Sequence, residues 1–161
     1  MGESGKMMEL FTGEYPVTLD EKSRISLPAF LRRCLNETNV WLTKGDEKCL
    51  KLYPSAKWNE MIINIMENTE SLSANDRALR RRILASSTPV EIDKAGRIPI
   101  AQNYREHSNV SKECVVIGQG DYIEIWDEGL YRKYDKASDE IYIAASEELS
   151  KKLKNKKGMP E

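Results

Sequence analysis

Histidine and cysteine are scarce in this sequence, and their scarcity excludes several kinds of chemistry. The 161 residues include one histidine, His107, and three cysteines, Cys34, Cys49 and Cys114, with no C-x-x-C pair and no Cys/His cluster. Zinc sites need such clusters, and most general acid–base mechanisms need a histidine. We therefore predict no metal site, no cofactor and no enzymatic activity, and we expect the cysteines to be buried thiols.

Long apolar runs are also absent. No stretch approaches the roughly 20 apolar residues that a transmembrane helix needs. The first ten residues, MGESGKMMEL, lack the apolar segment of a secretory signal. The sequence therefore predicts a cytoplasmic protein with no membrane partner. Its composition, 40% hydrophobic and 32% charged, is typical of a folded chain with a core.

The sequence has no excess of either charge, since 25 basic and 26 acidic residues give a net charge of −1. The charges are unevenly distributed, however. Basic residues cluster within residues 22–33, 77–82 and 151–157, whereas acidic residues collect within residues 127–148. A net charge near zero can therefore conceal a basic face. We expect the arginines of residues 77–82 on a solvated helix face or in ion pairs between subunits, and we expect the lysine-rich tail to be a solvating end.

An internal repeat with a spacing of 73 residues is the main feature of the sequence. The matching segments are Val17–Asp20 with Val90–Asp93, Arg24–Leu27 with Arg97–Ile100, and Leu50–Tyr53 with Ile123–Trp126. The alignment needs no gap over about forty residues. Each copy has the pattern of a strand, a charged turn, a short strand, a short helix and two further strands. Because one copy is too small for a stable sheet, two copies related by a pseudo-twofold axis are expected to share one core.

Helices are expected between the two copies and after the second. The first begins at Pro54 and carries an apolar stripe that we assign to the core, namely Trp58, Met61, Ile62, Ile65 and Met66. Ser73 and Asp76 form a capping box that begins a second helix. That helix ends at Ala85, and its inward-facing residues are Leu79, Ile83 and Leu84. A single last helix is expected over residues 128–154.

The motif D-x-x-x-R is the element that the two copies share best, at Asp20–Arg24 and Asp93–Arg97. In both copies it joins two strands through a tight turn, which an aspartate shapes by accepting backbone N–H bonds. The arginine can pair with that aspartate and only hold the turn, or it can reach a phosphate or a guanine edge. The repetition of the motif, with Lys22 and Lys94 in the same turns, favours a shared binding face.

These segments resemble the MraZ family of bacterial transcription regulators. The resemblance covers about residues 8–130 and rests on Phe11–Tyr15, Leu19–Pro28, Asp93–Ile98, Gly118–Gln119 and Glu124–Asp127. It implies an α+β fold with a mainly β core. Two AbrB-like swapped-hairpin repeats would form a pseudo-twofold double-ψ-type β-barrel with flanking helices. It also implies ring-shaped homo-oligomers in the nucleoid, which bind repeated short boxes upstream of the cell-division and cell-wall gene cluster that includes the protein's own gene.

The resemblance also gives a domain organisation and a set of site residues. The expected parts are a disordered leader (1–7), the first AbrB-like repeat (8–54), linking helices (55–87), the second repeat (88–130) and a C-terminal helix with a basic tail (131–161). Asp20 and Asp93 are expected to shape the turns. The residues expected to contact double-stranded DNA are Lys22, Arg24, Arg32, Arg33, Lys94 and Arg97.

Two departures from the family pattern and one alternative function stay open at this point. Ser23 stands where the family has glycine, so the first turn is expected to be altered. Ala101 stands where the first copy has Pro28, so the second short helix is expected to begin differently. The alternative function is that of an antitoxin-like AbrB-fold module, which would bind a protein partner through the acidic last helix.

Overall fold

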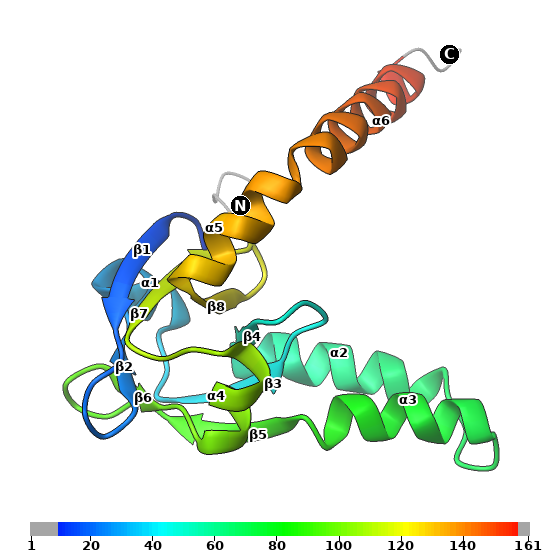
Figure 1. The fold of residues 1–161 in the computed structure, drawn as a ribbon. Coiled ribbons are helices and arrows are strands. Elements are labelled where there is room, and N and C mark those ends of the chain that lie inside the picture. Colours follow the sequence, from blue (N-terminus) through cyan, green and yellow to red (C-terminus); the bar gives the residue numbers. More distant parts are fainter. Residues whose placement is uncertain (1–9, 158–161) are drawn as a thin grey trace, which may run out of the picture. The chain divides into compact units, whose positions relative to one another are not determined.

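The computed structural model describes residues 10–157, and its fold is α+β (Figure 1). The expected leader, residues 1–7, lies outside the described residues. The elements are, in order, β1 (Glu14–Thr18), β2 (Arg24–Ser26), α1 (Ala29–Leu35), β3 (Asn39–Lys44), β4 (Leu50–Tyr53), α2 (Ser55–Glu67), α3 (Ala74–Leu84), β5 (Ser87–Glu91), β6 (Arg97–Pro99), α4 (Gln102–Ser108), β7 (Glu113–Gly118), β8 (Ile123–Asp127), α5 (Glu128–Ala137) and α6 (Asp139–Lys157). The chain divides into two units after Glu128, and each is described by itself.

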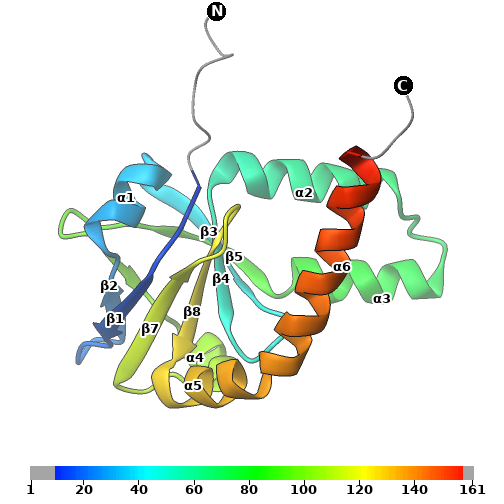
Figure 2. The same cartoon turned by 90° about the horizontal axis from the view of Figure 1, so that it is seen from above.

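The strands of the first unit form a six-stranded antiparallel sheet, in the order β1-β7-β8-β4-β3-β5, and a separate two-stranded ribbon, β2-β6. The first strand of each copy pairs with the other copy, since β1 lies beside β7 and β5 lies beside β3 (Figure 2). This exchange of strands makes the two copies one folding unit. Among the described strands, no ladder joins β1 to β5, so the sheet is not closed by hydrogen bonds. The double-ψ barrel therefore stays a prediction.

The strand register places a pseudo-twofold axis through both sheets. In the β2–β6 ribbon Ile25 lies opposite Ile98, and between β4 and β8 Lys51 lies opposite Glu124. Both pairs are 73 residues apart, so each of these residues faces its own counterpart in the repeat. A twofold axis through each ladder produces this register.

The alignment without a gap is wrong over one strand. Val40 in β3 and Cys114 in β7 occupy equivalent core positions, 0% and 1% exposed, yet they are 74 residues apart. The second copy has one more residue before this strand and one fewer in the following turn, which spans Gly45–Cys49 in the first copy and Gln119–Tyr122 in the second. Side chains alternate between the two faces of a strand, so the spacing shifts to keep apolar residues in the core.

The core of the first unit lies between the two copies and draws on both. Its fully buried side chains include Ile25, Leu27, Leu31, Leu42, Leu50, Leu52, Ile98, Ile100, Ile123 and Ile125. The two edge strands carry a proline at the same place, Pro16 in β1 and Pro89 in β5. Proline within a sheet is confined to edge strands, because it has no N–H to donate to a second neighbour.

The short helices α1 and α4 have the same backbone conformation at both caps, so the difference expected at their beginnings is not found in the cap dihedral angles. Pro28 and Ala101 both occupy the N-cap position, with φ/ψ of −56°/142° and −64°/160°. Pro28 therefore immediately precedes the first turn of α1. Asn36 and Asn109 end the helices with φ of 52° and 59°. The backbone thus repeats closely where the sequences differ.

Helices α2 and α3 form a hairpin that leaves apolar side chains uncovered. Ser73 caps α3 by accepting the N–H of Asp76 at 3.2 Å, as the capping box predicts. Trp58 is buried and stacks on Trp41 with ring centroids 4.6 Å apart. No residue of α3 is buried, so the prediction that one face of this helix packs inward is wrong for the single chain. The exposed apolar residues of the hairpin are Ile63, Met66, Leu72, Leu79 and Leu84.

The C-terminal unit contains two helices, so the prediction of a single last helix is wrong. α5 ends at Ala137, and α6 begins at Asp139. At the break, Ser138 Oγ donates to the carbonyl of Tyr134 at 2.7 Å, while its N–H bonds to the carbonyl of Asp135. Serine side chains compete in this way with helical hydrogen bonds. α6 then continues to Lys157, beyond the expected end at Lys154. Within the described part of the chain, no helix is long and apolar enough to cross a bilayer.

Candidate nucleic-acid interface

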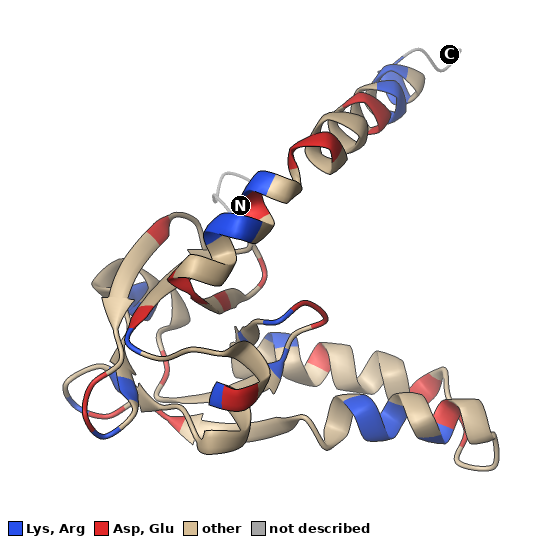
Figure 3. Ribbon diagram, in the orientation of Figure 1, with Lys and Arg blue, Asp and Glu red and all other residues tan. Residues whose placement is uncertain are grey.

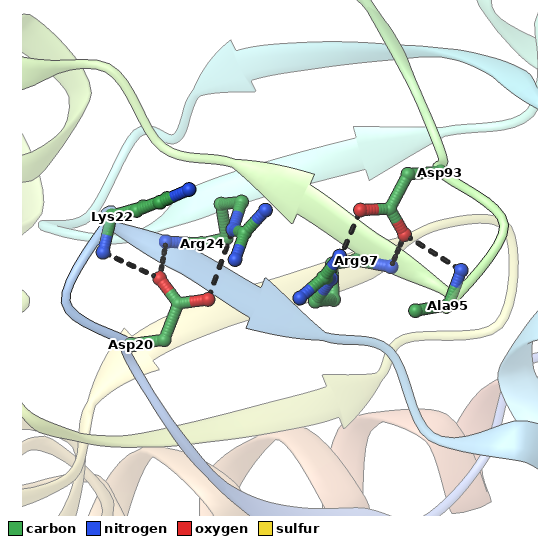
Figure 4. A network of polar contacts seen from close by, with 6 residues as sticks. All are labelled: Asp20, Lys22, Arg24, Asp93, Ala95 and Arg97. Carbon is green, nitrogen blue, oxygen red and sulfur yellow. Dashed lines mark hydrogen bonds and ion pairs between the residues drawn. The ribbon is translucent and has the colours of Figure 1, made fainter.

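The first D-x-x-x-R turn is organised by the carboxylate of Asp20 (Figure 4). Its Oδ1 accepts the backbone N–H groups of Lys22 at 2.8 Å and Arg24 at 2.9 Å, and its Oδ2 accepts Nε–H of Arg24 at 2.9 Å. The N–H of Arg24 and then its guanidinium keep the pKa of Asp20 below its ordinary value. The aspartate is therefore ionised at neutral pH while it holds the turn.

The second turn repeats these contacts one by one. Asp93 accepts the N–H groups of Ala95 at 2.9 Å and Arg97 at 2.8 Å, together with Nε–H of Arg97 at 2.9 Å. Gly96 has φ of +81°, and Ser23 takes the same left-handed region at +60°. The hydrogen bonds of the first turn are thus unaltered by Ser23, and the expected difference is confined to a conformational cost of about 1 kcal/mol.

The two arginines lie on the same exposed face of the β2–β6 ribbon. Ile25 and Ile98 face the core, so the residues beside them in each strand, Arg24 with Ser26 and Arg97 with Pro99, face outward. The arginine side chains are 27% and 35% exposed. Among residues 10–157, neither donates a side-chain hydrogen bond other than the one from Nε. The N–H donors of the terminal Nη groups are therefore available to another partner while Nε binds the aspartate of the turn.

Each turn is also fixed by the other copy. The N–H of Leu27 donates to the carbonyl of Gly96 at 2.8 Å, and the N–H of Ile100 donates to the carbonyl of Ser23 at 2.9 Å. Arg32 lies over the second turn: its Nε donates to the carbonyl of Leu27 at 3.1 Å, and a Cβ on Gly96 would come within 2.5 Å of its Nη1. These contacts make the ribbon and both turns one preorganised surface.

The remaining expected DNA contacts are exposed but unequal in the two copies. Lys22 and Lys94 lie at different positions in their turns, since Lys22 aligns with Ala95 and Lys94 with Glu21. Figure 3 shows basic and acidic segments close together in these loops. Arg33 is exposed on α1, with its guanidinium 5.9 Å from the Phe30 ring centroid.

Two residues of this surface are absent from the sequence-based site. Ser26 lies between the arginines on the outward face, and strict alternation along β2 would have identified it. Arg105 donates to the carbonyl of Ile100, as Arg32 does to that of Leu27. The 73-residue spacing between Arg32 and Arg105 was the signal for this second role.

One group of possible metal ligands occurs elsewhere in the described chain, but its chemistry does not suit a cation. Glu47, Cys49 and Glu124 place one ligand atom each within 4.8 Å of one another. Burial, followed by the charges of Glu124 and Glu47, raises the pKa of the Cys49 thiol to about 12. Glu124 already accepts Nε1–H of Trp126 at 2.9 Å. The thiol is therefore protonated, and we assign no metal to this group.

The comparisons with known proteins agree with the repeat seen in the fold. The family model described as "MraZ protein, putative antitoxin-like" matches the chain twice, over residues 10–82 and 83–153. A transcriptional regulator MraZ of Treponema denticola is 39% identical over 86% of this chain and 96% of its own length. Proteins of the same name from Treponema pallidum and Mycobacterium sp. strain KMS are 38% and 34% identical, over 86% of this chain and 93% and 96% of theirs. The chain belongs to the MraZ family.

Proposed function

We propose that this protein is a DNA-binding transcription regulator that contacts DNA through the outward face of the β2–β6 ribbon. The observation that carries the proposal is the presence of both Arg24 and Arg97 on that face, with each guanidinium bound to its aspartate through Nε alone. The major groove admits a two-stranded ribbon, and an arginine fork fits the O6 and N7 acceptors of guanine. The names of the curated relatives, transcriptional regulators, support the same function.

The other site residues have supporting roles in this proposal. Lys22, Lys94 and Arg33 neutralise phosphates and supply affinity without reading sequence. Arg32 lies against the second turn and serves mainly to position it, with a phosphate contact left to its outer nitrogens. Asp20 and Asp93 preorganise the arginines, so that less side-chain entropy is lost on binding.

We further propose that the protein assembles into a ring of identical subunits, which binds repeated boxes upstream of a cell-division and cell-wall gene cluster that includes its own gene. The exposed apolar residues of the α2–α3 hairpin support self-association, because a surface of this kind is usually covered by a partner. In this proposal the protein works at the nucleoid, and the pseudo-twofold core closes as a double-ψ barrel.

Gel-shift titration and footprinting on the DNA upstream of the protein's own gene test this function. We expect one protected region of repeated boxes, and tighter binding to three correctly spaced boxes than to one, because linked sites raise the effective concentration. Each neutralised phosphate contributes about −0.9 to the slope of log K against log salt concentration. Equal affinity for one box and three boxes contradicts the ring, and an unprotected promoter contradicts the function.

Arg24→Ala and Arg97→Ala locate the contact. A bidentate arginine–guanine contact is worth about 1–3 kcal/mol, so either change weakens specific binding about fivefold or more at each box. Arg81→Ala is the matched control, because Arg81 is an exposed arginine of α3 outside the ribbon. Unchanged binding by folded Arg24→Ala and Arg97→Ala places the DNA contact on another face.

A protein-binding function of the antitoxin-like type is the second candidate. The description of the matching family model and the exposed apolar side chains of α6, Ile141, Tyr142, Leu149 and Leu153, support it. Co-expression followed by size-exclusion chromatography distinguishes the two functions. A stable complex with an unrelated toxic protein supports the second candidate, provided that it is lost on removal of α6 while DNA binding is unchanged.

A further inference from the structure

A cavity of about 170 Å³ lies between the β3–β4 turn and the α2–α3 hairpin. It shares no lining residue with the β2–β6 ribbon or with the two D-x-x-x-R turns. Its wall carries three cations, Lys44, Lys51 and Arg82, one carboxylate, Asp46, and the apolar side chains of Met61 and Ile83.

Lys51 is a half-buried charge of this cavity. Its side chain is 16% exposed, and its Nζ lies 5.0 Å from the centroid of the Tyr122 ring. Among the described residues, Asp46 is the one carboxylate within 4.0 Å of this nitrogen, at 3.7 Å, and its own side chain is 94% exposed. An exposed partner of this kind contributes little, whereas desolvation of an ammonium is costly. Burial by itself would lower the pKa of Lys51, but Tyr53, Tyr122 and Asp46 outweigh it and keep that pKa above its ordinary value, so the cavity contains a charged ammonium at neutral pH.

The carboxylate best placed to neutralise Lys51 is engaged elsewhere. Glu124 lies opposite Lys51 across the β4–β8 ladder, so both side chains are on the same face of the sheet. Glu124 instead accepts Nε1–H of Trp126 at 2.9 Å and the amide of Gln119 at 3.4 Å. Lys44 and Arg82 form no ion pair within 4.0 Å in the described part of the chain. The lining of the cavity thus carries three cations and one carboxylate, Asp46.

We propose that this cavity binds a small phosphomonoester. Lys51 and Arg82 pair with the phosphoryl oxygens, since ammonium and guanidinium groups are the usual phosphate partners in proteins. The apolar side chains of Met61 and Ile83 contact the carbon chain of the ester. The site belongs to the first copy alone, because the second copy has Glu124 at the position equivalent to Lys51. The proposal rests on this cavity and is independent of DNA binding.

Calorimetric titration of the full chain with glycerol 3-phosphate, at constant ionic strength, tests the site. We expect saturable binding of one molecule per chain, with a rise in melting temperature that the same ionic strength of chloride does not produce. A hydrogen bond to a charged group is worth about a tenfold change in affinity, so Arg82→Ala weakens binding about tenfold. Arg81→Ala is the matched control, since Arg81 is the neighbouring residue of α3 and lies outside the cavity.

Two further variants separate this site from the DNA-binding face. Lys51→Met abolishes binding of the phosphomonoester and leaves DNA binding unchanged, whereas Arg24→Ala combined with Arg97→Ala leaves phosphomonoester binding unchanged. Equal effects of Arg81→Ala and Arg82→Ala overturn the proposal, as does saturable binding that disappears only in the Arg24/Arg97 variant. If Lys51→Met does not fold, the comparison of Arg82→Ala with Arg81→Ala decides.

Discussion

In each D-x-x-x-R turn, the residue before the arginine has a left-handed backbone conformation. This residue is serine in the first copy and glycine in the second, so the two residue types can be exchanged by substitution. Ser23 has φ of +60° and Gly96 has φ of +81°. A side chain in this region costs about 1 kcal/mol relative to glycine, and the greater freedom of glycine in the unfolded chain offsets part of the gain. We expect Ser23→Gly to raise the free energy of unfolding by about 0.5 kcal/mol.

The reverse change in the second copy is expected to cost more than the first change gains. Gly96→Ser loses about 1 kcal/mol through its backbone. Its Cβ would also lie 2.5 Å from Nη1 of Arg32, so that side chain has to move and its hydrogen bond to the Leu27 carbonyl is lost, at about another 1 kcal/mol. The total is about 2 kcal/mol, because the backbone cost and the lost contact add.

Chemical denaturation at a fixed protein concentration measures both variants. Arg32→Ala in the Gly96→Ser background isolates the clash, since it removes the side chain that the new Cβ would meet, and we expect it to recover part of the loss. DNA binding by Ser23→Gly should equal that of the original chain, because the contacts of Asp20 do not involve the Ser23 side chain. A neutral or destabilising Ser23→Gly refutes this account of the turn.

Three other predictions concern the core, the turns at low pH and the thiols. Trp58→Ala removes a buried ring stacked on Trp41 and should lower the free energy of unfolding by about 3–5 kcal/mol in thermal or chemical denaturation. Because folding lowers the pKa of Asp20 and Asp93, their contribution is complete above the ordinary value of 3.8 and is lost as the pH falls through the lower folded pKa. In acid-unfolding titrations, Asp20→Asn and Asp93→Asn should therefore flatten the loss of stability below pH 4. Cys49 and Cys114, whose pKa values burial raises to about 12 and about 11, should resist a thiol reagent at pH 8 until the protein unfolds, whereas the half-buried Cys34 reacts first.

The repeat spacing made the shared core and the turns predictable, because the β1–β7, β2–β6, β3–β5 and β4–β8 ladders each take one strand from either copy. The family assignment followed from the same paired motifs, and the family model matches both repeats. Compensating changes of length were not predictable, since an added residue before β7 and a shorter turn after it leave both motifs in register. The break at Ser138 was also hidden, because serine is compatible with a helix until its hydroxyl bonds to Tyr134.

Within the candidate site, the alternatives that the sequence left open prove to be compatible. A guanidinium has separate Nε and Nη donors, and Arg24 uses the first for Asp20 while the others face outward. The sequence alone could not show which nitrogen of the guanidinium bonds to the aspartate and which nitrogens remain for another partner. For the lysines, the sequence suggested more symmetry than the structure has. A lysine occurs in both turns, yet Lys22 and Lys94 are offset by one position relative to the repeat.

The prolines at the sheet edges limit how copies of this protein can join. Pro16 and Pro89 remove an outward N–H from the middle of β1 and β5, the two edge strands of the six-stranded sheet. Each proline therefore disfavours the addition of a strand from another molecule along these two edges. In the proposed ring, contacts between subunits would then use side-chain surfaces, so that exchange of subunits need not break any ladder of the six-stranded sheet.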